Sequence, residues 1–429
     1  MLNIIRSNDT KAMCQLLQAR ATTLLEAEGV VRPILEDVRK HGDRAIVRYA
    51  KKFDRLNLRR SGFTVSRQEI RQAYREVPRG FVEAVKAAAA NIRKAARRQL
   101  PCTWTCVTRP GIIIGQILRP LERVACYVPG GRFPLPSTVL MSVIPAQAGG
   151  VREVVVTSPR PAPAVLVAAD LLGVRKVYRL GGAQAIAAFA YGTESVPRVD
   201  KIVGPGNRYV AAAKKIVAGE CGIDFIAGPS ELVLVGGRGN AEWIAADLVA
   251  QAEHDPDAVA IFITPSMKLA MQVQAAARGI VARLELPVAG QALAAQGGII
   301  VTRTMPEAAE IVNRWAPEHL TLFEGATSLL GQVQSAGSIF LGAYSPVAAG
   351  DYASGTNHIL PTGGVARLRG GLSAADFVKS ISVQRLSPQG LERLKKTLVT
   401  LANTEGLRGH AYSVEARFAK KAAGIQGNS

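Results

Sequence analysis

The stretch VREVVVTSPRPAPAVLVAADLLGVRKVYRLGGAQAIAAFAY, residues 151–191, decides the fold class. Two short apolar runs stand in it, at Val151–Val156 and Lys176–Leu180. Each is followed by a segment with helical spacing, first Ala162–Leu172 and then Gln184–Tyr191. Short β-branched runs that alternate with helical segments are typical of a parallel sheet with crossover helices. The stretch therefore predicts a parallel α/β fold.

The same alternation continues toward the C-terminus. A short run at Lys201–Val203 precedes a helical segment at Arg208–Ala218. Helical stretches then separate a second series of short apolar strands, namely Leu232–Val235, Ala258–Thr264, Gly298–Thr302, Leu320–Phe323 and Ile339–Leu341. We therefore expect two tandem parallel-sheet domains.

The two ends of the chain have a different pattern. Apolar residues at three- and four-residue spacing predict helices through the first hundred residues. Two-residue alternation from Trp104 to Val128, around Arg109-Pro-Gly111, predicts a β-hairpin ahead of the main sheet. From about Leu372 we expect a helical tail without strands. The predicted fold is thus two tandem, incomplete Rossmann-like domains with helical N- and C-terminal extensions.

Composition is that of a globular protein. The chain has 429 residues, of which 48% are hydrophobic and 20% charged, so two or more domains are expected. The N-terminus lacks an apolar core of signal-peptide length, and no stretch reaches the roughly 18 apolar residues of a membrane span. The five cysteines are an odd number and argue against a disulfide framework. We therefore predict a cytoplasmic protein.

Two of these cysteines, Cys102 and Cys106, form a C-x-x-x-C pair. A metal site normally needs a second such pair nearby. Because the pair stands where alternation predicts a strand, we interpret both as packing residues.

A formal charge of +20 raises the alternative of a nucleic-acid-binding protein with a structural metal. The densest basic runs, Arg93–Arg98 and Arg393–Lys396, lie on predicted amphipathic helices. Aromatic residues make up only 5% of the chain, too few for obvious base-stacking platforms. We favour a solvated basic surface with some attraction for anionic cofactors.

The glycine-containing turns match a dinucleotide-binding motif only in part. No complete G-x-G-x-x-G follows a predicted strand and opens a helix. Three turns nevertheless leave a predicted strand into glycine, where free main-chain amides can meet phosphate. They are Tyr127-Val-Pro-Gly-Gly131, Gly181-Gly-Ala-Gln184 and Gly204-Pro-Gly-Asn207. The crevice where strand order reverses in a parallel sheet is the remaining general argument for such a site.

Two short motifs have residue types suited to chemistry. Gln251 and His254 are three residues apart on a predicted helix, so both can reach one metal ion, or form an ordinary helix-end pair. Glu318 and His319 follow a proline at a predicted exposed corner. An imidazole can accept a proton near neutral pH and a carboxylate can activate water. The alternative is a helix-to-strand loop with two solvated polar residues.

Two further segments contain paired candidates. In Gly350–His358, a turn-rich segment beyond a predicted strand, Asp351 and His358 are possible ligands, or the segment is a turn held by Asp and Asn side chains. Glu405 and His410 stand in the helical tail, where alone they indicate a helix end followed by a turn.

Together, and in this order, these segments resemble the histidinol dehydrogenase family. The resemblance runs from His41-Gly-Asp-Arg-Ala to Gly409-His-Ala, essentially the whole chain. Its most specific pieces are Tyr127-Val-Pro-Gly-Gly131, Gly204-Pro-Gly-Asn207, Ala227-Gly-Pro-Ser230-Glu, Gln251-Ala-Glu-His254-Asp-Pro, Ala316-Pro-Glu318-His319-Leu and Gly350-Asp351-Tyr-Ala-Ser-Gly.

The resemblance implies an aldehyde and histidinol dehydrogenase-like domain organisation. By it, residues 1–22 form an N-terminal helical extension. Residues 23–126 and 231–371 form a zinc and substrate domain, and residues 127–230 bind NAD. Residues 372–429 form a helical tail that is exchanged between the two subunits of a homodimer.

The resemblance also implies the activity, which is zinc-dependent, NAD-linked oxidation of L-histidinol through L-histidinal to L-histidine, the last step of histidine biosynthesis. One zinc per subunit would be held by Gln251, His254, Asp351 and His410, a nitrogen and oxygen set that zinc accepts. These four would also contact substrate through the metal.

By the same resemblance each remaining candidate has a role. His319 would accept the alcohol proton, and Glu318 would activate the water that hydrates the aldehyde. Tyr127, Gln184 and Asn207 would contact the cofactor. His319, Ser230, His358 and Glu405 would contact substrate, with Glu405 and His410 reaching the partner's site.

Three alternatives stay open at this point. A paralogue would share the zinc site and act on another small polar alcohol. A zinc hydrolase would use Glu318 and His319 on an ester or amide without nicotinamide. Aldehyde oxidation through a cysteine thiohemiacetal would use Cys126, the cysteine beside the Tyr127 turn.

Overall fold

The computed structural model describes residues 2–19, 24–131, 133–226 and 228–419. They divide into two compact units, each described here by itself. Unit 1 comprises residues 1–100 and 120–377, and unit 2 comprises residues 101–119 and 378–429. Ala227 of the glycine-proline-serine motif, Met1 and residues 20–22 of the expected N-terminal extension, and the tail beyond residue 419 lie outside the described residues. None of the helices in the described ranges is long and apolar enough to cross a membrane.

Unit 1 contains a six-stranded parallel sheet with the order β1-β11-β10-β9-β12-β13. Its central strands are buried apolar runs, as expected when helices cover both faces of a sheet. The strands are β1 (Asn3–Arg6), β9 (Glu231–Val235), β10 (Val259–Thr264), β11 (Gly298–Val301), β12 (His319–Leu322) and β13 (Ser338–Leu341).

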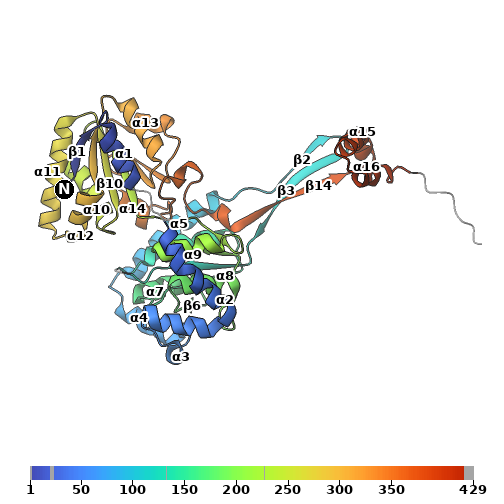
Figure 1. Ribbon diagram of the computed structural model, residues 1–429, viewed down its shortest axis with the longest axis horizontal. Coiled ribbons are helices and arrows are strands. Elements are labelled where there is room, and N and C mark those ends of the chain that lie inside the picture. The colour runs from blue at the N-terminus through green and yellow to red at the C-terminus, as the bar shows by residue number, and fades with distance from the viewer. Residues whose placement is uncertain (1, 20–23, 132, 227, 420–429) are drawn as a thin grey trace, which may run out of the picture. The chain divides into compact units, whose positions relative to one another are not determined.

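Helices cover both faces of this sheet (Figure 1). One core joins the sheet to α10 (Ala241–Ala252), α11 (Met267–Arg283) and α12 (Pro287–Ala295). The other joins it to α1 (Thr10–Ala19) and α13 (Met305–Trp315). A short helix, α14 (Val347–Tyr352), follows β13.

Unit 1 also contains a five-stranded parallel sheet with the order β6-β5-β4-β7-β8. The chain runs outward from β4 to β6 and returns to β7 on the other side of β4, so strand order reverses between β4 and β7. The strands are β4 (Arg123–Tyr127), β5 (Glu153–Thr157), β6 (Val177–Tyr178), β7 (Lys201–Val203) and β8 (Gly222–Ile223).

Helices of unit 1 also pack against this second sheet. One core contains residues of α4 (Arg67–Glu76), α5 (Phe81–Arg98), α6 (Pro136–Ala148) and α7 (Pro163–Leu171). The other contains residues of α2 (Leu25–Asp54), α8 (Gly182–Tyr191) and α9 (Arg208–Val217). A single turn, α3 (Leu58–Ser61), follows α2.

This packing differs from the expected grouping of residues 23–126 with residues 231–371. Helix α2 packs against α8 and α9, and β4 is the central strand of the five-stranded sheet. An amphipathic pattern shows that a helix has an apolar face but not which sheet it covers. The N-terminus also differs from the expected helical extension, because β1 adds an edge strand beside β11 before α1 begins.

Unit 2 contains the predicted hairpin. Strands β2 (Trp104–Arg109) and β3 (Ile112–Pro120) pair antiparallel across a turn in which Gly111 has a φ of 83°. The tail differs from the helical expectation, because β14 (Val378–Leu386) pairs with β3 before α15 (Pro388–Thr404) and α16 (Arg408–Glu415) begin. Most residues of β14 are exposed and polar residues interrupt it, so it lacks the apolar run of a buried strand.

Candidate functional site

Glu318 and His319 lie where α13 passes into β12. The helix ends at Trp315, the capping residue Ala316 has a left-handed φ of 50°, and His319 is the first residue of β12. Both residues are buried, with 5% and 4% of their surface exposed. The expectation of an exposed corner is therefore wrong. Strand β12 is flanked by β9 and β13, and these neighbours cover the corner.

The main chain of Glu231, the first residue of β9, holds both groups. Its amide donates to Oε2 of Glu318 at 2.7 Å, and its carbonyl oxygen is 3.1 Å from Nδ1 of His319. Because a carbonyl can only accept, Nδ1 carries the proton in this arrangement. The lone pair of the neutral ring is therefore on Nε2, which is buried and makes no hydrogen bond within the described residues.

His319 is surrounded by carboxylates. Its Nδ1 lies 3.5 Å from Oε2 of Glu318, and its Nε2 lies 3.5 Å from Oδ1 of Asp351. Burial alone lowers the pKa of His319, but the charges of Glu318 and Asp351 outweigh burial and raise the pKa to about 10. The ring is therefore a cation at neutral pH unless these negative charges are offset.

Asp351 is the centre of a small cluster of histidines. Burial raises its pKa, but His319, His358 and His254 together hold it below the ordinary value, so the carboxylate stays ionised. Nδ1 of His358 donates to the carbonyl oxygen of Asp351 at 2.8 Å. Burial lowers the pKa of His358, so this ring is neutral and its Nε2 keeps a lone pair.

The cluster lies at the amino ends of β9 and β12, not at carboxyl ends. Asp351 follows the carboxyl end of β13 in sequence, where parallel α/β enzymes usually place function. Helix α14 nevertheless brings its carboxylate to His319, at the opposite end of β12. The general rule for parallel sheets therefore predicts the wrong edge for this cluster.

The remaining ligand candidates are distributed over both units. Gln251 is buried in the last turn of α10, and His254 is exposed just beyond that helix. Ser230 directly precedes Glu231. Glu405 and His410 are exposed residues of unit 2, at the end of α15 and in α16.

Zinc suits these donors in chemistry. An amide oxygen, a carboxylate and imidazole nitrogens are accepted ligands, and Asp351 is already ionised. In geometry, the described part of the chain holds no cluster of three or more His, Cys, Asp or Glu side chains spaced to bind a metal. Unit 1 thus supplies three donors of the right kind, Gln251, His254 and Asp351, and His410 belongs to unit 2.

The three predicted cofactor residues stand near carboxyl ends of the five-stranded sheet. The Tyr127 hydroxyl, at the end of β4, accepts from the amide of Gly182 at 3.1 Å. Gln184 is buried in α8 and donates to Asp54 at 3.0 Å. The side chain of Asn207 caps α9 by accepting from two main-chain amides at 3.1 Å each. Sequence reasoning did not single out Asp54, which is distant in sequence from every glycine turn.

The turn after β7 packs against the end of β4. Gly204 has a φ of 116°, and a Cβ there would overlap the carbonyl oxygen of Tyr127. Only glycine permits both this backbone and this approach. The predicted glycine turn therefore lies where the strand order reverses, the position at which parallel sheets bind dinucleotides.

Cys126 is unsuited to covalent catalysis. It is fully buried in β4, and burial together with the charge of Asp224 raises the pKa of its thiol to about 12. A nucleophilic cysteine needs thiolate character and access. In unit 2, Cys102 and Cys106 are both exposed, so the packing role expected for them is not seen within this chain.

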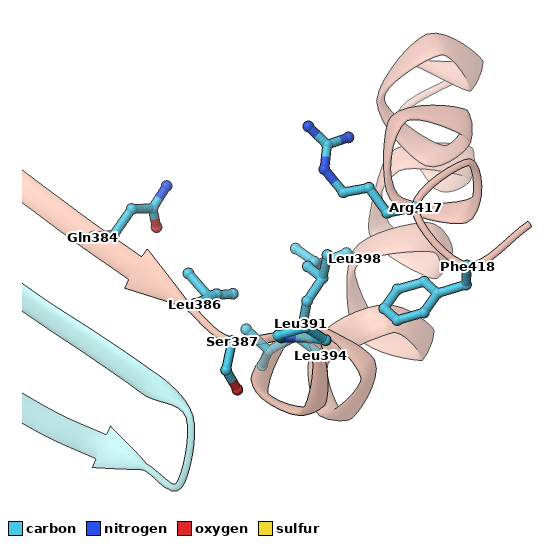
Figure 2. Close-up of a pocket in the computed structure, with 9 residues that line it drawn as sticks. Gln384, Leu386, Ser387, Leu391, Leu394, Leu398, Arg417 and Phe418 are labelled. Atoms are coloured by element: carbon cyan, nitrogen blue, oxygen red, sulfur yellow. The ribbon is translucent and has the colours of Figure 1, made fainter.

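Unit 2 contains an apolar groove of about 540 Å³ between the end of β14, α15 and the segment after α16 (Figure 2). Leucine side chains of α15 and the ring of Phe418 face it, with Gln384, Ser387 and Arg417 as polar lining residues. No candidate catalytic, cofactor or metal residue is among its lining residues.

The family model of histidinol dehydrogenase matches residues 17–418 of this chain. A histidinol dehydrogenase of Methanothermobacter thermautotrophicus is 44% identical over 427 residues, covering 97% of this chain and 100% of that protein. One of Bacillus cereus is 47% identical over 398 residues, covering 90% of this chain and 92% of that protein.

The fold has a solved counterpart. The crystal structure of histidinol dehydrogenase from Elizabethkingia anophelis superposes with a TM-score of 0.92 at 35% identity. The superposition covers 97% of this chain and 98% of the Elizabethkingia anophelis chain. This agreement confirms the parallel α/β fold class predicted from the sequence.

Proposed function

Because the chain belongs to the histidinol dehydrogenase family, we propose that it oxidises L-histidinol through L-histidinal to L-histidine with two molecules of NAD. One observation carries the proposal at the level of the site. Glu318 and His319 are buried side by side, both held by the main chain of Glu231, beside the carboxylate of Asp351. The arrangement provides one proton acceptor for each oxidation.

In the first oxidation, His319 takes the hydroxyl proton of histidinol through Nε2 while hydride passes to NAD. The bond from Nδ1 to Glu231 fixes the tautomer that this role requires. Zinc bound by Gln251, His254, Asp351 and His410 would supply positive charge that orients the substrate's nitrogen donors and offsets the carboxylate of Asp351. With that carboxylate offset, the pKa of His319 falls toward the range in which an imidazole accepts protons at neutral pH.

In the second oxidation, Glu318 removes a proton from the water that adds to histidinal. Its Oε2 is held by the amide of Glu231, which fixes the carboxylate against the His319 ring. The hydrated aldehyde then loses hydride to a second NAD and becomes a carboxylic acid, which releases its remaining acidic proton to water and leaves the carboxylate of histidine. A buried pair of this kind replaces a cysteine thiohemiacetal, because Cys126 has no accessible thiolate.

We assign the five-stranded sheet to NAD and the six-stranded sheet to substrate and zinc. Tyr127, Gln184 and Asn207 stand close to the reversal of strand order, which supports the first assignment. Ser230 directly precedes Glu231, and His358 donates to the main-chain carbonyl of Asp351, so we assign both to the substrate site. The five cysteines are free thiols, which suits a reducing compartment, and we place the reaction in the cytoplasm.

We further propose that the enzyme is a homodimer in which Glu405 and His410 complete the partner's site. Both are exposed in unit 2, where they do not themselves form a ligand cluster. Unit 2 also exposes large apolar side chains, as expected of a surface that a second chain covers. These are Trp104, Val107, Ile114, Ile381, Val383, Leu401 and Leu407.

The proposal is tested by NADH formation from L-histidinol and NAD with the purified full chain, before and after chelation and zinc add-back. We expect two NADH per histidinol, lost with the chelator and restored by zinc. Turnover of another small polar alcohol but not histidinol would favour a paralogous activity. No NADH from any alcohol by zinc-loaded protein would overturn the proposal.

A further inference from the structure

A buried ion pair lies behind the glycine turn that follows β7. Lys214 of α9 and Asp224, just after β8, are 2% and 4% exposed and form a salt bridge. Both also bind the main chain of Gly204. Asp224 Oδ2 accepts from the Gly204 amide at 2.7 Å, and Lys214 Nζ donates to the Gly204 carbonyl oxygen at 3.1 Å.

Buried apolar residues adjoin both members of the pair in the chain. Lys214 stands among buried residues of α9 that include Val210 and Val217, and Asp224 precedes the buried Phe225. Burying two charges costs several kcal/mol in desolvation, and apolar replacement of such a pair is often neutral or stabilising. Stability alone is therefore a poor reason for an ion pair here.

The two charged side chains restrain Gly204. They hold both main-chain polar groups of Gly204, the residue whose backbone packs against the carbonyl of Tyr127 where strand order reverses. Beyond it, Asn207 begins α9 with its side chain capping the helix. Fixing Gly204 thereby fixes where the turn 204–207 and the amino end of α9 stand relative to β4.

We propose that Lys214 and Asp224 are positioning residues for the NAD site, acting through Gly204 without touching the cofactor. The inference rests on the proposed function, because it gives the turn a dinucleotide to bind. Misplacing this turn should weaken binding of NAD while leaving the Glu318 and His319 chemistry intact. We therefore expect KM for NAD to rise while KM for histidinol and kcat stay nearly unchanged.

The decisive variants are Lys214→Met, Asp224→Asn and the double variant Lys214→Met/Asp224→Leu. The double variant removes both charges together and keeps apolar bulk, so its fold tests whether the pair is needed for stability. Lys215→Met is the matched control, because it removes the neighbouring lysine of α9 and breaks its ion pair with Glu28.

For each folded variant of the pair, we expect KM for NAD to rise about tenfold or more, with KM for histidinol and kcat at saturating NAD within about twofold. The control should keep all three constants. Equilibrium dialysis of NAD against the full chain should give the same ranking. An unchanged KM for NAD in the double variant, or equal losses for both substrates, would overturn the inference while wild-type turnover stands. Failure of the wild-type chain to form NADH would instead overturn the proposed function and this inference together.

Discussion

Nε2 of His319 lies 3.5 Å from a carboxylate oxygen of Asp351, although the two residues belong to different elements. Together with Glu318, this carboxylate holds the His319 ring protonated in the metal-free protein. The proposed proton acceptor is thus ready only when the charge of Asp351 is taken up elsewhere. The protonation state of His319 therefore depends on whether a bound cation offsets the charge of Asp351.

The first prediction concerns pH and stability of the metal-free protein. The pKa of His319 is raised from 6.5 to about 10, so its contribution to stability is complete below pH 6.5 and is lost as pH rises through 10. Asp351→Asn removes one carboxylate, so its free energy of unfolding should fall less steeply over this pH range. Urea unfolding at several pH values between 6.5 and 10 measures the free energy of unfolding. The same dependence of this free energy on pH in wild type and Asp351→Asn would contradict the electrostatic account.

His319→Asn should lower the rate of the first hydride transfer by about 10²–10⁴-fold, the usual contribution of a general base. The asparagine keeps a polar group near the Glu231 carbonyl but has no basic nitrogen. Single-turnover NADH formation at saturating histidinol measures the step. A rate within tenfold of wild type would remove His319 from the proton transfer.

Gly204→Ala should weaken NAD binding and lower stability by about 1–3 kcal/mol or more, because an alanine there is strained by the left-handed φ and overlaps the Tyr127 carbonyl. Gly219→Ala is its control, since a Cβ at Gly219 meets nothing within 4 Å. Thermal unfolding and NAD titration of both variants make the comparison. Equal behaviour of the two would show that the close approach is not needed.

Cys126→Ala should keep the full yield of NADH per histidinol. Its buried thiol, with a pKa of about 12, takes no part in the proposed route. Removing the sulfur leaves a small cavity that costs about 1–2 kcal/mol of stability. A variant that stops after one NADH would revive the thiohemiacetal route.

Local patterns in the sequence predicted the parallel sheets and the hairpin. Runs such as Leu232–Val235 are buried along their whole length, so their apolar composition alone identifies them as strands of a covered sheet. Strand β1 has only four residues at a sheet edge, and β14 is mostly exposed, so neither has such a run. The amphipathic pattern of α2 predicts a helix, but it does not predict that this helix packs against α8 and α9.

The candidate site could be predicted only in part. The adjacency of Glu318 and His319 is visible in the sequence, but their burial depends on β9 and β13 pairing on either side. The role of Glu231 is carried by its main chain, which no residue type reveals. Likewise, Lys214 and Asp224 are ordinary charged residues until the fold buries them against Gly204.

The most direct test of the central claim, that Glu318 and His319 divide the two oxidations, is the number of NADH formed per histidinol by Glu318→Gln with zinc and excess NAD. The glutamine can still accept from the Glu231 amide, so the site keeps its geometry and loses only the base. We predict rapid formation of about one NADH, with the second slowed by about 10²-fold or more. Two NADH at the wild-type rate would contradict the account.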